Sequence, residues 1–318
     1  MTKQIPKIKI LDLMIKARVL EERLIRMNKA GQGFFWIGGP GEEAFNVALG
    51  LCIQKGEGLD YDYLHFHYRQ SATLMAMGAP MIDSIRQMHH VATDPYSGGR
   101  NFVNHFSVPK WNVTPINSPI EVQYAIAIGT GVAQARHGGS GITIVTGGDA
   151  GTAEGEFASC MVWASRQKRE LPILMIVTNN SWGISTAYEE VHCKAPIAQR
   201  ADGFGIRNAV VDGNDANASW IAISEAMHYV RTARKPFLLE ARVSRLYGHS
   251  SASGANRIPE PDCLERFEKE LLQEKVIQKD SIKKIRDTYE KESREALTQV
   301  LQEPKPDPQT LFENIWQP

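Results

Sequence analysis

The second half of the chain alternates short, continuously apolar runs with longer segments of helical periodicity. The apolar runs lie at 142–146, 172–178, 206–211 and 237–243, and helical segments such as 154–165 and 218–233 separate them. A strand that is apolar throughout is buried on both faces, and helices between such strands cover both faces of a parallel sheet. We therefore predict an α/β fold built on a doubly wound parallel sheet with helices on both faces.

Helical patterns flank this sheet core on both sides. Leu13, Ala17 and Leu20 are spaced by four and three residues, which is the periodicity of an amphipathic helix. The pattern also predicts a short strand at 61–67, helices at 42–53, 81–91, 119–136, 262–276 and 279–301, and an extended proline-rich tail at 304–308. We predict one domain over 1–318, with an N-terminal helical part (1–60), a sheet core (119–258) and a C-terminal helical arm and tail (259–318).

The charge and cysteine content argue against several classes of protein. Lys plus Arg and Asp plus Glu both number 36, so the formal net charge is zero and no global field favours nucleic acid or an anionic membrane. No apolar stretch reaches the roughly 18 residues of a membrane span. The four cysteines lie far apart without a Cys-x-x-Cys pair, which fits neither a disulfide framework nor a zinc site. We expect neither nucleic acid nor a membrane as partner.

The amino terminus bears on cellular location. It has lysines but no long apolar core and no small-residue cleavage site, so it is unlike a secretory signal. It is poor in acids, as mitochondrial presequences are, but helical periodicity begins at Leu13 and leaves little to remove. We expect a bacterial cytoplasmic protein rather than one of the mitochondrial matrix.

Two strand ends carry the residues with the clearest chemistry. Gly148 and Asp149 follow the first apolar run, and Asn180 follows the second. Ligands of open α/β sheets bind at the carboxyl ends of the strands. The amides near Gly151 open the next helix, where unpaired N–H groups favour phosphate, and carboxylate and amide oxygens suit Mg²⁺ beside a phosphate. Either motif alone is also a common turn, but the pair on successive strands favours a site for a diphosphate and magnesium.

This pair of strand ends also resembles a known cofactor motif. Gly148-Asp149-Ala150, then residues 151–178, then Asn179-Asn180 is similar to the motif of thiamine diphosphate enzymes. The flanking segments 153–157 and 179–186 resemble the alpha subunit of the decarboxylating component of 2-oxo acid dehydrogenase complexes. Further matches, between about Leu13 and Trp316, are Gly41-Glu42-Glu43, Tyr68-Arg69, Ser118-Pro119-Ile120, 211–215 and 247–250. The resemblance implies a thiamine diphosphate-binding fold.

By this resemblance, one set of residues binds thiamine diphosphate and Mg²⁺. The implied Mg²⁺ ligands are Asp149, Asn180 and the carbonyl of Trp182. The implied cofactor-binding residues are Tyr68 and Arg69 at the diphosphate, Gly148, Asp149, Ala150, Gly151 and Asn180 around the phosphates and metal, Ser118 at the aminopyrimidine, Ile120 beneath the bent cofactor, and His249. His249, in the family's active-site loop, is also the catalytic candidate, because a histidine there donates to an oxyanion or moves a proton. For Ile120, spacing alone leaves core packing as the alternative.

The other histidine pairs carry no such motif. We interpret His65 and His67, and likewise His89 and His90, as structural residues rather than metal ligands.

The sequence departs from the family pattern at several positions. Ala150 replaces the third motif glycine, and Thr178 stands where some relatives have an arginine. Val122 removes a side-chain oxygen from a segment that binds K⁺ in some relatives, which puts a K⁺ site in doubt. The active-site loop 251–254 lacks the usual aspartate, and we interpret Ser250, the position phosphorylated in animal relatives, as a loop serine. These departures leave a non-catalytic homologue as one alternative.

The resemblance implies oxidative decarboxylation of a 2-oxo acid by thiamine diphosphate, with acyl transfer to a lipoyl-bearing acyltransferase partner. In this family the beta subunit supplies the glutamate that engages the pyrimidine ring of the cofactor. Because no segment of the 318 residues offers that module, we expect the active site at an alpha–beta interface in an α2β2 tetramer. The other enzyme class considered, a nicotinamide dehydrogenase, needs a G-x-G-x-x-G motif after a strand, which residues 148–155 do not fit.

Two features favour a branched-chain 2-oxo acid over pyruvate or acetoin as substrate. Residues 303–308 followed by Leu311-Phe312 resemble the tail of the branched-chain subtype. The segment 34–37 lacks the histidine of the pyruvate and acetoin subtypes, so we expect an apolar substrate side with Phe35 and Trp36 as its candidates. An apolar pocket separates such substrates by only about 1–3 kcal/mol per methylene, so the other two substrates stay open.

Overall fold

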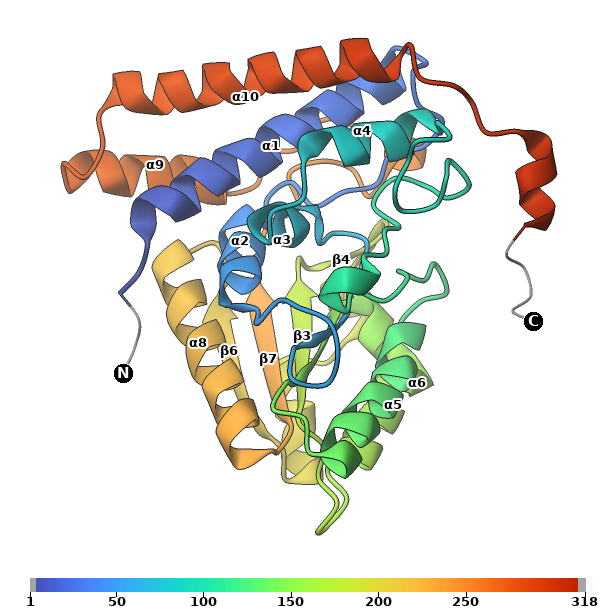
Figure 1. Ribbon diagram of the computed structural model, residues 1–318. Helices are drawn as coiled ribbons and strands as arrows, with labels where there is room; N and C mark the ends of the chain where they lie inside the picture. The colour runs from blue at the N-terminus through green and yellow to red at the C-terminus, as the bar shows by residue number, and fades with distance from the viewer. Residues whose placement is uncertain (1–3, 314–318) are drawn as a thin grey trace.

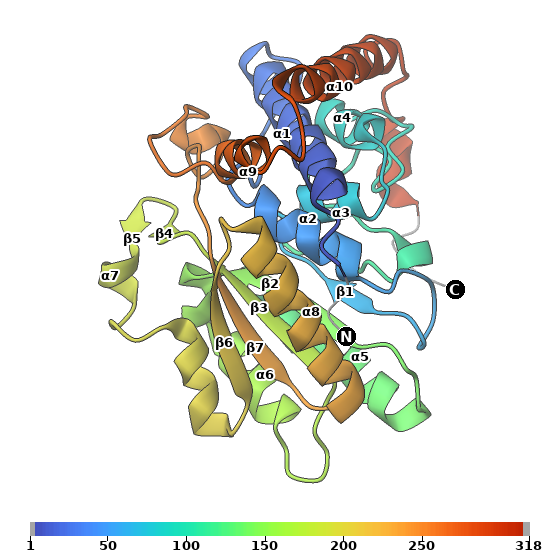
Figure 2. The same ribbon diagram turned by 90° about the vertical axis from the view of Figure 1, so that its left-hand side faces the viewer.

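The computed structural model describes residues 4–313, and its centre is a five-stranded sheet (Figures 1 and 2). The strands lie in the order β1 (Tyr63–His65), β2 (Thr143–Gly148), β3 (Ile173–Asn179), β7 (Phe237–Arg242) and β6 (Arg207–Asp212). Every neighbouring pair is parallel. These are the five strands that the sequence pattern predicts, with slightly shifted ends, so the predicted parallel sheet is confirmed.

Helices cover both faces of this sheet. α5 (Val122–His137) and α6 (Gly155–Ala164) lie on one face, and α2 (Glu43–Cys52) and α8 (Ala216–Ala233) lie on the other (Figure 2). Each pair of helices packs with the sheet around its own group of buried apolar residues. The doubly wound arrangement predicted from the apolar runs is therefore confirmed.

The residues of β3 show how one strand serves both faces. Ile173, Met175 and Val177 pack with α5 and α6, whereas Leu174 and Ile176 pack on the side of α2 and α8. Side chains alternate across a strand, so a strand covered on both sides needs apolar residues at successive positions. This is why the second apolar run has no polar interruption before its carboxyl end.

A helical layer lies above the sheet in Figure 1 and joins the two ends of the chain. α1 (Lys7–Lys29) packs against α10 (Lys279–Val300) and α9 (Cys263–Gln273), so the predicted N-terminal helix and C-terminal arm lie side by side. The shorter elements are α3 (Ser71–Ala76), α4 (Met81–His89), α7 (Tyr188–Val191), the paired strands β4 (Trp182–Gly183) and β5 (Thr186–Ala187), and 3-10 turns at Pro109–Trp111, Ala150–Ala153, Ile197–Phe204, Ser251–Ser253 and Pro308–Phe312. α3 is not predicted by the sequence pattern.

Three further observations concern the chain as a whole. Within residues 4–313, no helix is long and apolar enough to cross a membrane. The assignment of 1–318 to one domain stays a prediction. Positions 1–3 and 314–318, which include Trp316 at the end of the family resemblance, lie outside the described residues.

A buried ion-pair cluster holds the helical layer to the rest of the fold. Arg18 of α1 donates to Glu43 Oε1 of α2 at 2.6 Å and to Asp262 Oδ2, just before α9, at 2.7 Å. All three side chains are almost completely buried. Burial alone would raise the pKa of Asp262, but the hydrogen bonds and charge of Arg18 hold it well below its usual range. One guanidinium thus joins three helices from opposite ends of the sequence.

We predict that Arg18→Met destabilises the fold by about 3–5 kcal/mol, because it leaves the buried Glu43 without its counter-charge and Asp262 with only the partly exposed Arg257. The measurement is the free energy of unfolding from urea titrations at pH 7. The matched control is Lys291→Met, which removes an exposed pair with Glu295 and should change stability by less than about 0.5 kcal/mol. A loss of less than about 1 kcal/mol for Arg18→Met would show that the cluster is not what holds the layer.

Candidate active site

Asp149 and Asn180 leave adjacent strands at the same edge of the sheet. β2 and β3 pair in parallel with Gly148 opposite Thr178, so the residues that follow each strand end are neighbours. Asp149 leads into the 3-10 turn Ala150–Ala153, and Asn180 begins the turn before β4. The juxtaposition expected from two separate strand ends is confirmed by the strand pairing.

A recess of about 90 Å³ opens at this edge. Its lining includes every residue to which the family resemblance gives a role toward cofactor or metal, namely Tyr68, Arg69, Ser118, Ile120, Gly148, Asp149, Ala150, Gly151, Asn180, Trp182 and His249. The remaining lining residues are His67, Asn117, Pro119, Glu121, Gln123, Gly183 and Ile184. The fold therefore brings the candidates together, while the role of each one stays a prediction.

The Asp149 carboxylate has the features of a cation ligand. The residue is only 2% exposed, and its Oδ2 has no hydrogen-bond partner within the described residues. Burial raises the pKa of Asp149 to about 6, although neighbouring backbone N–H groups and the charge of Arg69 favour the ionised form. A buried polar atom without a partner costs about 1–3 kcal/mol, and more when it is charged. A divalent cation at Oδ2 would remove that cost.

Asn180 is placed to add a second oxygen. It is buried, and its Oδ1 accepts a hydrogen bond from the Trp182 backbone N–H at 3.1 Å. An amide oxygen has two lone pairs, so this single bond leaves it able to contact a cation as well. The same bond holds the turn that carries the Trp182 carbonyl.

Arg69 fixes the protonation state of His249. Its Nη2 lies 3.1 Å from His249 Nδ1 and donates to the His249 carbonyl at 3.3 Å. A guanidinium only donates, so Nδ1 accepts and the ring proton is on Nε2. Burial, together with the positive charges of Arg69 and Arg245, lowers the pKa of His249 to about 4. The imidazole is therefore neutral at pH 7 and has one N–H donor.

The loop that carries His249 is tied to Trp36. The Trp36 N–H donates to Ser251 Oγ at 3.0 Å, and the Ser251 N–H donates to the Trp36 carbonyl at 2.7 Å. The indole is fully buried, and its N–H donates to Oε2 of the buried Glu21 at 2.9 Å. Neither Trp36 nor Phe35 lines the recess, and their assignment to the substrate side stays a prediction. Ser250, predicted as a loop serine, is buried and caps the turn that follows it.

Ile120 and Ser118 lie on one wall of the recess. Ile120 is 62% exposed, so the alternative that it is a core residue is wrong. Ser118 Oγ is 2.9 Å from His105 Nε2, so its hydroxyl is already engaged. The exposed isoleucine leaves an apolar surface at the mouth of the recess.

Glu121 is a buried carboxylate that the sequence analysis did not single out. Its Oε1 accepts from the Gly148 N–H at 3.1 Å, and its Oε2 accepts from Gln123 Nε2 at 3.3 Å. Burial, together with the charge of Asp149, raises the pKa of Glu121 to about 8. A Cβ at Gly151 would lie 2.1 Å from Glu121 Oε1, so this motif position needs glycine. In the sequence, a glutamate at a helix start is an ordinary first-turn acid, and nothing marked it.

His67 and Arg245 were also missed. His67 lines the recess, and its Nδ1 has no hydrogen-bond partner within the described residues, which goes beyond the structural role predicted for it. Arg245 donates to the Ile184 carbonyl at 2.8 Å, and its guanidinium lies 5.7 Å from the centre of the Trp182 ring. Both residues lie beside motifs that the sequence does show, Tyr68-Arg69 and 247–250, and this adjacency is the signal that could have indicated them.

A parallel sheet whose carboxyl edge carries glycine turns, an unpaired carboxylate and a buried arginine is typical of α/β proteins that bind a diphosphate with a divalent cation. A family model described as "Dehydrogenase E1 component" matches residues 11–309. The chain belongs to this family, whose members depend on thiamine diphosphate.

Individual relatives narrow the comparison. The 2-oxoisovalerate dehydrogenase subunit alpha of Bacillus subtilis is 30% identical over 238 residues, which span 75% of this chain and 70% of the relative. The mitochondrial 2-oxoisovalerate dehydrogenase subunit alpha of Homo sapiens is 26% identical over 326 residues, which span 98% of this chain and 72% of the relative. The mitochondrial 2-oxoisovalerate dehydrogenase subunit alpha 1 of Arabidopsis thaliana is 28% identical over 250 residues, which span 79% of this chain and 51% of the relative. Relatives therefore come from bacteria and from mitochondria.

We predict that His249 titrates near pH 4 and is neutral, with its proton on Nε2, at pH 7. Because the fold lowers this pKa from the ordinary 6.5, the resulting contribution to stability is complete above pH 6.5 and is lost as the pH falls towards 4. The measurement is ¹H–¹⁵N NMR of histidine-labelled protein, with His249→Gln to assign the signal.

Arg69→Gln serves as the comparison for this titration. It removes one of the two positive charges near the ring, so the pKa of His249 should move upward. A wild-type pKa near 6.5, or a proton found on Nδ1, would contradict the assigned contact with Arg69.

Proposed function

We propose that this chain is the alpha subunit of a thiamine diphosphate-dependent dehydrogenase that decarboxylates branched-chain 2-oxo acids. The acyl group passes to a lipoyl-bearing acyltransferase, and the working enzyme is an α2β2 tetramer in the bacterial cytoplasm. The names of the relatives support the substrate class and the subunit type. The observation that carries the proposal is the buried, unpartnered Asp149 carboxylate beside Asn180.

The residues present fit the diphosphate half of the cofactor. Asp149, Asn180 and the Trp182 carbonyl would hold Mg²⁺, which accepts carboxylate, amide and carbonyl oxygens. Arg69 and Tyr68 would contact the diphosphate oxygens, since a guanidinium binds phosphate through charge-assisted hydrogen bonds. The Ala150–Ala153 turn offers its first backbone amides beside them.

The bound cofactor supplies the electron-accepting centre for loss of CO₂ from a 2-oxo acid. His249 then acts as a neutral hydrogen-bond donor from Nε2 toward a substrate oxygen. Arg69 keeps it in this form, because protonation at Nδ1 would place two cations in contact. Ile120 would support the cofactor from below with its exposed apolar side chain.

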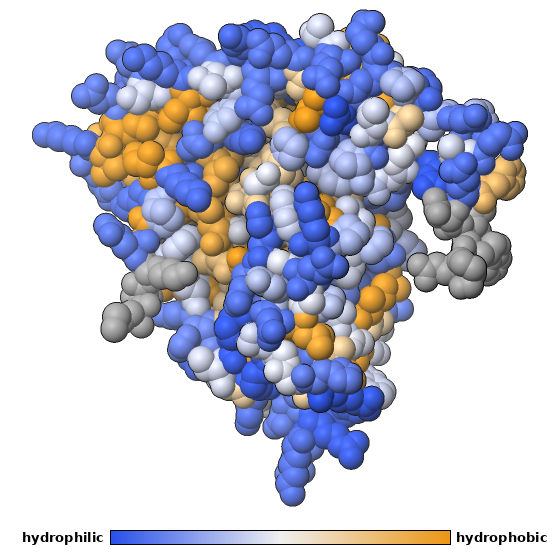
Figure 3. Space-filling view, viewed as in Figure 1, coloured by the Kyte–Doolittle hydropathy of each residue, from blue (hydrophilic) through white to orange (hydrophobic). Residues whose placement is uncertain are grey.

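The recess is too small to be a complete site. Its volume of about 90 Å³ compares with the 300–1,000 Å³ of typical ligand pockets. Ile120 and Ile184 at its mouth are 62% and 54% exposed. Figure 3 shows further apolar residues in the region of α5 and α6, and Ile126 in α5 is exposed. A beta subunit packed against this side would cover these side chains and close the site.

The carboxylates of the recess also indicate a partner. Asp149 and Glu121 are the acids among its lining residues. Glu121 accepts from Gly148 and Gln123, so it is already committed to the chain's own backbone and side chains. Both lining carboxylates thus have a role within this chain's half of the site, which agrees with a glutamate for the pyrimidine ring supplied by the beta subunit.

The segment that binds K⁺ in some relatives is held here by the protein itself. Gln123 Nε2 donates to the Thr146 carbonyl at 3.0 Å and to Glu121 at 3.3 Å. Val122 offers no side-chain oxygen. These bonds tie the start of α5 to the end of β2, and the K⁺ site that Val122 puts in doubt stays untested.

We predict that Asp149→Ala lowers the affinity for thiamine diphosphate by at least about tenfold in the presence of Mg²⁺, because the diphosphate loses its metal-mediated counter-charge. The fold should persist, since the residue ends a strand at the sheet edge. The measurement is calorimetric titration of the cofactor, with thermal unfolding as a check on folding. The control Glu154→Ala removes a nearby exposed carboxylate and should leave affinity unchanged. Equal affinities in the wild type and Asp149→Ala would refute the metal assignment.

We predict negligible decarboxylation by the purified alpha chain and activity once a cognate beta subunit is added, because the pyrimidine half of the site is absent from alpha. The assay is release of CO₂ from 3-methyl-2-oxobutanoate with an artificial electron acceptor. Pyruvate and acetoin are the comparison substrates. Because acetoin has no carboxyl group to release, the three substrates are compared by reduction of the artificial acceptor, and turnover should be lower with both. Equal turnover by alpha alone would refute the divided site, and a preference for pyruvate or acetoin would refute the branched-chain assignment.

A further inference from the structure

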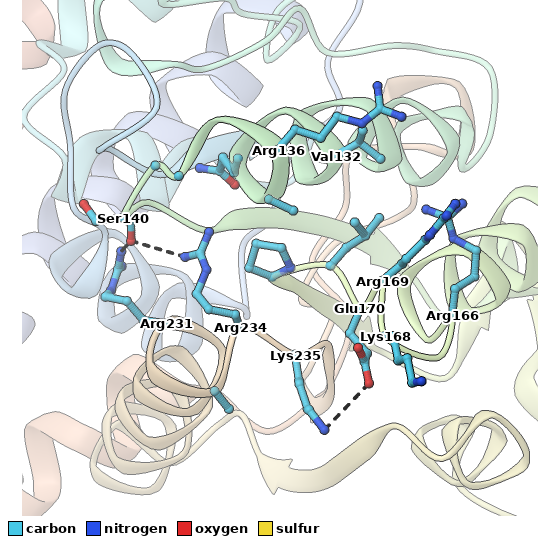
Figure 4. Close-up of a pocket in the computed structure, with 17 residues that line it drawn as sticks. Val132, Arg136, Ser140, Arg166, Lys168, Arg169, Glu170, Arg231, Arg234 and Lys235 are labelled. Atoms are coloured by element: carbon cyan, nitrogen blue, oxygen red, sulfur yellow. Dashed lines mark hydrogen bonds and ion pairs between the residues drawn. The ribbon is translucent and has the colours of Figure 1, made fainter.

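A second and larger recess lies at the opposite edge of the sheet, where the strands begin. It has a volume of about 1050 Å³ and is formed by the ends of α5 and α8 and by the turns that precede β2, β3 and β7. Its apolar lining residues include Val132, Leu171 and Pro172, which we call the apolar floor. Figure 4 shows the recess and labels Val132, which belongs to α5. Its volume is at the upper end of the range for small-molecule pockets.

The rim of this recess is strongly cationic. Its basic side chains are Arg136, Arg166, Lys168, Arg169, Arg231, Arg234 and Lys235, and Glu170 is its one acid. In Figure 4, Arg231 and Arg234 lie on the side of Ser140, and Arg166, Lys168 and Arg169 lie on the opposite side. A chain of zero net charge therefore concentrates positive charge around one recess.

Structural contacts account for four of these cations. Lys235 pairs with Glu170 at 3.7 Å, and Arg231 pairs with the buried Asp62 at 2.9 Å. Arg234 donates to the Gly141 carbonyl at 2.7 Å. Arg166 donates to the Trp163 carbonyl at 3.1 Å in the last turn of α6, where a cation complements the helix dipole.

The other three cations have no structural contact of this kind. Arg136, Lys168 and Arg169 make no side-chain hydrogen bond or ion pair that the structure shows within residues 4–313, although each lines the recess. Arg136 lies in the last turn of α5, where the helix dipole favours a cation, whereas Lys168 and Arg169 lie in the loop that follows α6. Like charges gathered without counter-charges repel one another, and an anionic ligand would relieve that repulsion.

We propose that this recess binds a small organic polyphosphate, that is, a molecule with at least two phosphate groups and a less polar body. The phosphates would lie among the unpaired cations, where arginine forms bidentate hydrogen bonds, and the body would rest on the apolar floor. Cations on two opposite sides suit several phosphates better than one. A stably bound protein segment would need an interface of more than about 1,000 Å² rather than one recess.

The proposed site is separate from the cofactor site. β2 and β3 run from this recess to Asp149 and Asn180, and a strand of six or seven residues spans about 20 Å. Both sites could therefore be occupied together, and the inference does not depend on the proposed enzymatic function.

The test is a calorimetric titration of the full chain, saturated with thiamine diphosphate and Mg²⁺ so that the carboxyl-edge recess is blocked. The ligands are ADP, coenzyme A and inorganic pyrophosphate, which separate a nucleotide, a coenzyme and the bare diphosphate as sources of the same chemistry. The site variant is Arg136→Gln with Arg169→Gln, both exposed residues. The control is Lys284→Gln with Lys291→Gln, which removes two charges from the exposed face of α10.

The proposal expects one molecule of ADP or coenzyme A per chain. It expects an affinity that falls at least about tenfold in the site variant, changes less than about twofold in the control, and weakens with added salt. If pyrophosphate binds but ADP and coenzyme A do not, the recess recognises phosphate groups without an organic body. That result would overturn the organic part of the proposal. No binding by the wild type, equal binding by the site variant, or binding lost in Asp149→Ala instead would overturn the site.

Discussion

The guanidinium of Arg69 is the group on which the arrangement of the active site depends. It is buried, and it donates to the Gly38 carbonyl and to His249 while lying 3.9 Å from Glu42 Oε1. Burial raises the pKa of Glu42 to about 7, and the charge of Arg69 opposes this rise. A buried cation that lost these neighbours would cost several kcal/mol. Arg69 therefore holds three segments together: the glycine loop before α2, the segment that follows β1, and the active-site loop.

The same charge also sets the chemistry of the recess. It helps to keep His249 neutral and favours the ionised form of Asp149. One side chain thus supports a hydrogen-bond donor on one wall and a cation ligand on another. His249 is needed in its neutral form and Asp149 in its charged form, and the single charge of Arg69 favours both. The chain can therefore set both protonation states without a partner subunit.

The parts of the fold that could be predicted are those with a local cause. The strands and their carboxyl-terminal turns follow from continuous apolar runs that end in glycine and polar residues. α3 could not be predicted, because nearly all of its six residues are buried and it has no polar face to contrast with an apolar one. The burial of Trp36 could not be predicted, because it depends on a hydrogen bond to a glutamate of α1 that sequence spacing does not reveal. Glu121 was missed for the same reason.

Net charge was the least informative feature of the sequence. Equal numbers of acids and bases argued against a polyanionic partner. The fold, however, places an acidic group and a set of basic groups at opposite edges of the sheet. At the carboxyl edge, Oδ2 of the buried Asp149 has no hydrogen-bond partner, and at the amino edge Arg136, Lys168 and Arg169 pair with no acid, among the residues that the structure describes. In a parallel sheet the helices point their carboxyl ends to the amino edge, where basic residues are favoured, so part of this sorting follows from the topology alone.

The proposed division of the active site between two chains rests on the groups that this chain leaves unpaired and exposed. Its charged and hydrogen-bonding groups gather around Asp149, where the diphosphate and metal would lie. Its exposed apolar side chains, Ile120 and Ile184, lie at the mouth. Burying an aliphatic side chain is worth about 1.5–3 kcal/mol, so a cofactor and a partner surface that cover these residues gain affinity from the same contact. Cofactor binding and subunit association should therefore favour each other, because each supplies apolar surface that the other needs.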